Sequence, residues 1–340
     1  MFILVCIFVM WLMIFGVASV YYSMVVERAH AHLLLVFVLS LFVGSIVWFN
    51  GAYSLAFGNR WLWLANLQTI DLEELLNMMF QLCFALYAIV MLIGSVIDRV
   101  KLKGILLLVG GWTVLVYAPL AHLFWHPNGW LQQIGALDFS GGMVVHLSAG
   151  LSCYILAHAI PSSCPKITYF NMKWLFIGVL FITLGWFGFN AGPVGELNQH
   201  AMLVIINTLL AIIAGGFSWF IAHLILNQEQ SIAALLNGMV VGLVTSTSSV
   251  GYVKPWQLII IVTVASFITC WIIDRLLSKC PIDDVVDSFG MNGVGGLLGS
   301  IGTVCFIPSA LYGQTIGILV TVLLSSIVTF TLTKVLKPYL

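Results

Sequence analysis

Charge is what this sequence has least of. Only 7% of its 340 residues are charged, with 12 basic and 12 acidic side chains, whereas 61% are hydrophobic. A soluble domain carries about 25% charged residues, and so few charges could not cover a water-soluble fold of this length. The composition therefore excludes a soluble enzyme, a disordered chain and a nucleic-acid-binding protein. It predicts a protein that crosses the lipid bilayer many times.

Recognisable chemistry is also scarce. There is no HExxH, GxSxG or P-loop motif, so neither an enzyme nor a cofactor is expected. His122 and His126 have a spacing that suits a metal, but no third ligand is near, and we expect no metal site. The cysteines form no CxxC pair and mostly lie in apolar runs, which is typical of small core residues; they are Cys6, Cys83, Cys153, Cys164, Cys270, Cys280 and Cys305.

Long apolar runs dominate the chain. A bilayer-spanning helix needs about 20 apolar residues, a helix satisfies its own backbone groups in lipid, and the period-2 alternation of a membrane β-barrel is missing. We therefore expect an all-α, polytopic membrane protein with a single domain over 1–340 and eleven transmembrane helices. The expected spans lie near 3–25, 31–57, 75–97, 104–125, 140–160, 172–191, 201–225, 232–248, 257–277, 289–309 and 313–334.

The basic residues predict the orientation, because cytoplasmic loops are enriched in Lys and Arg. With the N-terminus outside, only Arg60 and Lys254 would face the exterior. The other ten would lie inside: Arg28, Arg99, Lys101, Lys103, Lys166, Lys173, Arg275, Lys279, Lys334 and Lys337. The sequence thus predicts an external N-terminus and a cytoplasmic C-terminus in the cell (inner) membrane.

Two helix starts resemble each other. Leu137-Asp-Phe-Ser-Gly-Gly-Met-Val-Val-His146 opens the fifth span, and Val286-Asp-Ser-Phe-Gly-Met-Asn292 opens the tenth. Five spans apart means opposite orientation, as in inverted repeats. We expect two inverted five-helix repeats, about 3–160 and 172–309, followed by a last helix at about 313–334.

Polar side chains inside these spans are candidates for function. Asp138 is interpreted first as a helix N-cap, a role compatible with shaping a binding site. His146 is either a hydrogen-bonded packing residue or a polar group that faces a small neutral solute. Asn292 is either a residue that hydrogen-bonds neighbouring helices together or the partner of His146 across the repeat axis.

Aromatic residues form a second candidate site. Phe80, Phe84, Trp125 and Phe189 fall near the predicted outer ends of spans three, four and six. An interfacial belt would account for most aromatics in a membrane protein, but several rings at one mouth could bind a cation by their faces.

At these residues the sequence resembles the ammonium transporter/methylammonium permease/Rhesus family, and its bacterial ammonium transporters in particular. The matching stretches keep the family order over nearly the whole chain: Tyr53-Ser-Leu-Ala-Phe-Gly58, Tyr117-Ala-Pro-Leu-Ala-His-Leu-Phe-Trp125, Gly135-Ala-Leu-Asp-Phe-Ser-Gly-Gly-Met-Val-Val-His146, Gly185-Trp-Phe-Gly-Phe-Asn-Ala-Gly192 and Asp283-Asp-Val-Val-Asp-Ser-Phe-Gly-Met-Asn-Gly-Val-Gly-Gly296.

The resemblance implies a homotrimer with one narrow apolar pore per subunit. By motif position, Trp125 and Phe84, with Phe80 one turn away, match the external ammonium-recruitment site, and Asp138 matches the acidic residue beneath it. Phe84 and Phe189 match the stacked gate. The family mechanism implies that ammonium is recruited by cation–π contact, loses its proton and crosses as ammonia.

Two positions depart from the family pattern. Pro193 stands where the family has the recruitment-site serine, which removes a hydroxyl and a backbone donor. His146 matches the first pore histidine, but Asn292 replaces the second, and an amide does not titrate near neutral pH. The first hypothesis is therefore ammonium transport without a His–His proton relay. The alternative is an ammonium-sensing membrane protein that transports little and acts through a signalling partner.

Overall fold

The bundle is helical throughout the part of the chain that can be described. The computed structural model describes residues 1–58, 60–161 and 171–340, and every regular element within those ranges is a helix or helical turn. Lys166 and Cys164 lie outside the described residues. Ten helical stretches are long and apolar enough to span a membrane, and an eleventh apolar helix, Ile232–Ser246, is shorter. The prediction of an all-α bundle with about eleven spans is confirmed.

The helices follow the predicted apolar runs. The first half of the chain forms α1 (Phe2–Met24), α2 (His30–Val47), α3 (Tyr53–Phe57), α4 (Leu72–Gly94), α5 (Leu102–Trp112), α6 (Ala118–Trp125), α7 (Trp130–Gln133) and α8 (Ser148–Ala159). The second half forms α9 (Met172–Ala191), α10 (Gln199–Asn227), α11 (Ile232–Ser246), α12 (Pro255–Arg275), α13 (Gly295–Phe306) and α14 (Leu311–Leu336).

Several crossings are not continuous α-helices. Four interruptions join or open helices. The first is a kink within Trp48–Ala52, where Asn50 and Gly51 are not helical, and the other three are π turns at Thr113–Tyr117, Gly142–Leu147 and Phe289–Val294. A π turn adds a residue to the helical ladder and is frequent at functional sites. Two of the four carry the predicted pore residues, because His146 lies in the third and Asn292 in the fourth.

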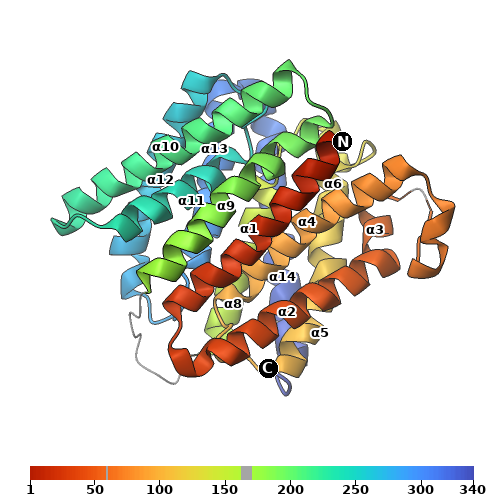
Figure 1. Ribbon diagram of the computed structural model, residues 1–340, viewed down its shortest axis with the longest axis horizontal. Coiled ribbons are helices and arrows are strands. Elements are labelled where there is room, and N and C mark those ends of the chain that lie inside the picture. Colours follow the sequence, from red (N-terminus) through yellow and green to blue (C-terminus); the bar gives the residue numbers. More distant parts are fainter. Residues whose placement is uncertain (59, 162–170) are drawn as a thin grey trace.

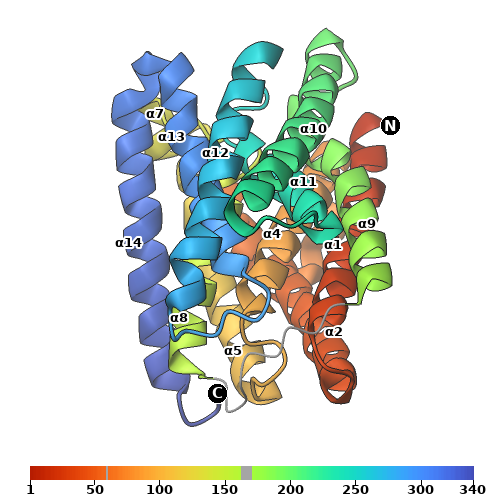
Figure 2. The same ribbon diagram turned by 90° about the vertical axis from the view of Figure 1, so that its left-hand side faces the viewer.

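The arrangement agrees with an odd number of crossings. The two termini lie at opposite ends of the bundle (Figures 1 and 2). Helices α1 and α9, the first helices of the two predicted repeats, run side by side (Figure 1). Their approach requires small residues: a Cβ on Gly16 would lie 2.8 Å from the Gly178 oxygen. Helix α14 packs on α8 and α5 at one side of the bundle (Figure 2).

The two central π turns cross where glycines allow backbone contact. A Cβ on Gly150 would lie 2.3 Å from the Gly293 nitrogen, and a Cβ on Gly296 would lie 2.5 Å from the Gly142 oxygen. Distances this short exclude any side chain at the crossing. The backbone contact therefore brings the side chains of the two π turns together in the middle of the bundle.

Candidate functional site

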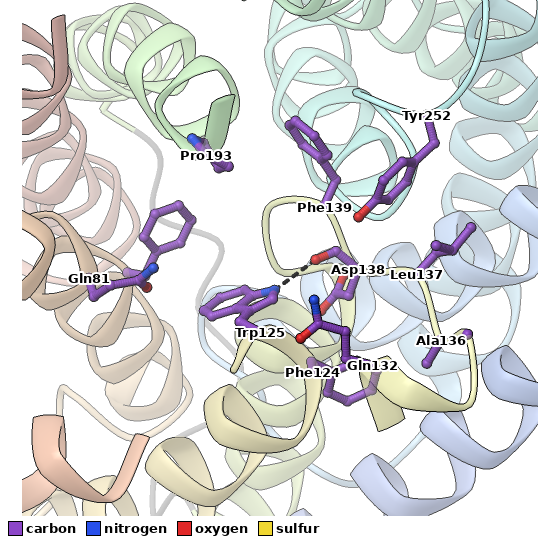
Figure 3. Close-up of a pocket in the computed structure, with 12 residues that line it drawn as sticks. Gln81, Phe124, Trp125, Gln132, Ala136, Leu137, Asp138, Phe139, Pro193 and Tyr252 are labelled. Carbon is purple, nitrogen blue, oxygen red and sulfur yellow. Dashed lines mark hydrogen bonds between the residues drawn. The ribbon is translucent and has the colours of Figure 1, made fainter. Parts of the chain in front are cut away.

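A cavity of about 350 Å³ opens at one end of the bundle. Its wall is shared by α4, α6, the segment before the Gly142–Leu147 turn, and the Pro193 turn (Figure 3). It is lined by Gln81, Phe84, Phe124, Trp125, Gln132, Gly135, Ala136, Leu137, Asp138, Phe139, Pro193 and Tyr252. The structure thus brings together three of the four predicted recruitment residues. Phe80 does not line the cavity, but its ring lies 5.1 Å from that of Phe84.

Trp125 is held in place by the loop that carries Asp138. Its indole Nε1–H donates to the Asp138 carbonyl oxygen at 2.7 Å (Figure 3). Its ring centroid lies 5.4 Å from that of Phe84, with the planes at 66°. An indole fixed at both its polar edge and its side offers a constant π face to the cavity, the geometry a monovalent cation prefers.

Asp138 closes the floor of the cavity and caps the helix below it. Its Oδ2 accepts the backbone N–H groups of Met143 and Val144 at 3.0 and 2.9 Å. The carboxylate thus satisfies free N–H groups of the helix start as the sequence predicted, but the N-cap residue itself is Gly141, three residues after Asp138. Asp138 precedes the membrane-crossing segment that begins at Gly142. Burial raises the pKa of its carboxyl group to about 7, although the backbone N–H groups favour the charged form.

Two phenyl rings separate the cavity from the centre of the bundle. The ring centroids of Phe84 and Phe189 lie 4.3 Å apart at an interplanar angle of 39°, and both side chains are fully buried. Beneath them, the imidazole of His146 lies 6.1 Å from the Phe189 ring. The predicted gate residues are therefore adjacent, and they block the direct route from the cavity to the pore residues.

His146 and Asn292 form one hydrogen bond whose direction is fixed. His146 Nδ1 lies 2.9 Å from Asn292 Oδ1. The Asn292 amide cannot be reversed without losing a partner, because its Nδ2 donates to the Ser288 carbonyl at 3.2 Å. A carboxamide oxygen only accepts, so the neutral imidazole carries its proton on Nδ1. Its Nε2 is then an acceptor, and it is buried without a partner among the described residues.

Aromatic packing holds the imidazole plane. Trp186 stacks on His146 at 5.4 Å with an interplanar angle of 5°, and Tyr87 approaches edge-on at 5.9 Å. Asn190 fixes the helix end that carries Phe189: it accepts from Ser140 Oγ at 2.7 Å and donates to Thr208 Oγ1 at 3.1 Å. These contacts were missed in the sequence, where only the density of glycine and aromatic residues at 185–192 marked the segment.

The structure corrects the alignment of the two helix starts. The sequence paired Asp138 with Asp287, whereas the structural counterpart of Asp138 is Asp284. Asp284 Oδ2 accepts the Phe289 N–H, five residues on, as Asp138 Oδ2 accepts that of Met143. Asp287 instead matches Gly141: both have positive φ, at 50° and 105°. With this register each carboxylate stands eight residues before the central polar side chain, 138 to 146 and 284 to 292.

His122 of α6 and His126, which follows that helix, have other partners. His122 Nδ1 bonds the Ala56 carbonyl at 3.0 Å, and His126 Nδ1 accepts the Asn128 N–H at 3.1 Å. Their rings stack at 4.6 Å. No group of three ligating side chains suited to a metal occurs among the described residues.

Comparison with known proteins identifies the family. The model of the Ammonium Transporter Family matches residues 1–340. The chain belongs to the ammonium transporter family. It is 32% identical to the ammonium transporter of Bacillus subtilis over 98% of this chain and 91% of that protein. It is 33% identical to the ammonium transporter Amt1 of Archaeoglobus fulgidus over 85% and 76% of the two chains.

Solved structures agree with this assignment. Mep2 of Saccharomyces cerevisiae superposes with a TM-score of 0.87 at 26% identity, over 98% of this chain and 84% of that chain. A sensor Amt protein superposes with a TM-score of 0.90 at 23% identity, over 99% and 92%, which shows the shared fold alone. Ammonium transporters are membrane transporters and not enzymes, so this chain is a multi-pass transporter of the cell membrane.

Proposed function

We propose that this ammonium transporter conducts ammonia derived from ammonium through each subunit without passing a proton between two pore side chains. The observation that carries the proposal is the fixed direction of the hydrogen bond from His146 Nδ1–H to Asn292 Oδ1. A relay requires both partners to take up and release a proton, and a carboxamide does neither near neutral pH. The pair acts as a rigid polar contact in the pore.

The outer cavity supplies what a cation needs. The faces of Trp125 and Phe84 each contribute about 0.5–2 kcal/mol of cation–π attraction, and Asp138 adds negative charge from beneath when ionised. We assign Trp125, Phe84 and Asp138 to recruitment, with Phe80 supporting the Phe84 ring. Ammonium is concentrated here before it reaches the gate.

The route beyond the gate favours a neutral molecule. Phe84 and Phe189 form the gate, and past His146 a second cavity of about 40 Å³ is lined largely by apolar side chains, with Tyr87 and Asn292 at its wall. An unpaired ion in such surroundings is strongly disfavoured, whereas ammonia needs only a hydrogen-bond partner. His146 Nε2 offers an acceptor to the N–H groups of ammonia as it passes. A homotrimer, as the family resemblance implies, would contain three such routes.

Charge movement in proteoliposomes tests the proposal. The proton that ammonium loses crosses the membrane by a path outside the His146–Asn292 pair, so an ammonium pulse should evoke a transport current in the parent. This current should persist in His146→Ala and in Asn292→His. The control is the parent without ammonium. A current abolished by His146→Ala would overturn the absence of a relay.

Sensing is the second candidate, and the changes at Pro193 and Asn292 favour it because both remove groups from the transport route. It requires ammonium binding without appreciable flux, together with a signalling partner. Uptake of methylammonium by the purified, reconstituted protein decides between the two functions: rapid uptake eliminates sensing without transport.

A further inference from the structure

The outer cavity contains a hydrogen-bond acceptor that has no donor. Gln81 of α4 lines the cavity together with Trp125 and Pro193 (Figure 3). Phe84 of the same helix also lines it. Its Oε1 atom is buried and has no hydrogen-bond partner among the described residues. Buried acceptors are nearly always paired in folded proteins, so an unpaired one in the wall of a cavity points to a ligand that carries a donor.

The wall formed by the turn Gly192–Val194 offers no side-chain acceptor. Proline has no backbone N–H and no hydroxyl. The turn Gly192–Val194 lies directly on α4, since a Cβ on Gly192 would meet the Phe80 ring at 2.3 Å. Phe80 is the chain neighbour of Gln81. The turn without a side-chain acceptor and the helix that carries the unpaired Gln81 oxygen are therefore in contact.

Three other side chains that line the cavity, Gln132, Asp138 and Tyr252, could also accept a hydrogen bond. Gln132 is exposed, and so is Tyr252 with 45% of its surface accessible. Asp138 Oδ1 is the other buried lining atom without a partner among the described residues, but its carboxylate is anchored through Oδ2 to the helix start. The carboxamide of Gln81, in contrast, can rotate easily about its last side-chain bond and turn its oxygen towards a ligand.

We propose that Gln81 supplies the side-chain acceptor for ammonium in the outer cavity, in place of the hydroxyl that Pro193 lacks. The inference rests on the proposed recruitment of ammonium at this cavity and identifies what selects it. Gln81 stands three residues before Phe84, hence on the same face of α4. A cation over the Phe84 ring can direct an N–H towards the amide oxygen. Ring faces attract any small cation, whereas an acceptor favours one that carries N–H groups.

Binding measured without transport tests this role. Isothermal titration calorimetry with ammonium chloride is applied to the purified protein in lipid nanodiscs. Gln81→Leu keeps the side-chain bulk and removes the acceptor, and we expect ammonium to bind about ten-fold more weakly, as for one hydrogen bond to a charged group. The matched control Gln133→Leu changes an exposed glutamine that does not line the cavity, and it should stay within about two-fold of the parent.

Rescue distinguishes an acceptor from a packing residue. In the double variant Gln81→Leu/Pro193→Ser the serine hydroxyl replaces the acceptor, so affinity should return to within about three-fold of the parent. Gln81→Met repeats the test if the leucine variant does not fold. Parent-like affinity in both single Gln81 variants, or a double variant as weak as the single one, overturns the inference. If the parent binds ammonium but conducts none, only the proposed transport is overturned. If the parent binds no ammonium, the proposed recruitment and the role of Gln81 are both overturned.

Discussion

Replacement of Gly150 by alanine should disrupt the centre of the transporter. The new Cβ would lie 2.3 Å from the Gly293 nitrogen and 2.5 Å from its Cα, whereas ordinary contact begins at 3.4 Å. The obstructing atoms are backbone and cannot rotate away as the end of a side chain can. Helix α8, which carries Gly150, and the Phe289–Val294 turn must therefore separate by about 1 Å. Forced overpacking of this kind costs about 1–3 kcal/mol.

The separation acts directly on the polar pair. Gly150 follows His146 by one helical turn, and Gly293 is the next residue after Asn292. A hydrogen bond of 2.9 Å that lengthens by about 1 Å is broken. The buried imidazole N–H then lacks a partner, which costs a further 1–3 kcal/mol or so. The free energy of unfolding should fall by about 2–6 kcal/mol in total.

Thermal unfolding of the detergent-purified protein, followed by tryptophan fluorescence, measures the loss, and the ammonium-evoked current should fall with it. Gly110→Ala is the matched control on α5, because its Cβ would meet only the side chains of Val43 and Val47 at 3.7 Å. It should leave stability unchanged or raise it by up to about 1 kcal/mol. A Gly150→Ala protein with the parent's unfolding midpoint and current would refute the reasoning.

Three further changes test the outer site. Ammonium affinity, measured by calorimetry, should fall as the pH is lowered from about 8 to 6, because Asp138 is protonated near its raised pKa of about 7 and loses its negative charge. The Asp138→Asn protein should bind ammonium weakly and without this pH dependence. Gln314→Leu removes paired bonds of 2.8 and 2.9 Å to the Leu137 backbone, so it should lower the free energy of unfolding by about 1–3 kcal/mol in the same thermal assay; an unchanged midpoint would contradict this. Trp125→Phe keeps a ring face but loses the 2.7 Å bond to the Asp138 carbonyl, and ammonium affinity should drop about three- to ten-fold, whereas parent-like affinity would show that the bond is dispensable.

The helical spans were predictable because lipid imposes a strong constraint on composition. Apolar runs of sufficient length placed every crossing within a few residues: the predicted 75–97 became Leu72–Gly94, and 172–191 became Met172–Ala191. The recruitment and pore residues were named through the family resemblance, and the structure brings them into two connected groups. Which end of the bundle faces outside stays a prediction, based on the distribution of basic residues.

The local backbone geometry could not be predicted from the sequence. Hydropathy reports burial along a continuous helix, so it could not reveal the π turns at Gly142–Leu147 and Phe289–Val294. The counterpart of Asp138 was misassigned because several aspartates precede Asn292, and only the contact with the Phe289 N–H selects Asp284. Gln314 went unnoticed because its partner, the loop at Leu137, is 177 residues away in the chain.

The backbone repeats between the two halves of the chain, whereas the central polar side chains do not. In both halves a carboxylate caps a π turn five residues on, a residue with positive φ follows the carboxylate by three, and a glycine follows the central polar residue by four. Although the backbone is the same at both positions, one half carries the imidazole of His146 and the other the carboxamide of Asn292. Because Ser288 fixes the orientation of that carboxamide, the pair has a single proton position. Under the proposed conduction of ammonia, the proton left behind by ammonium must therefore leave by a route other than this pair.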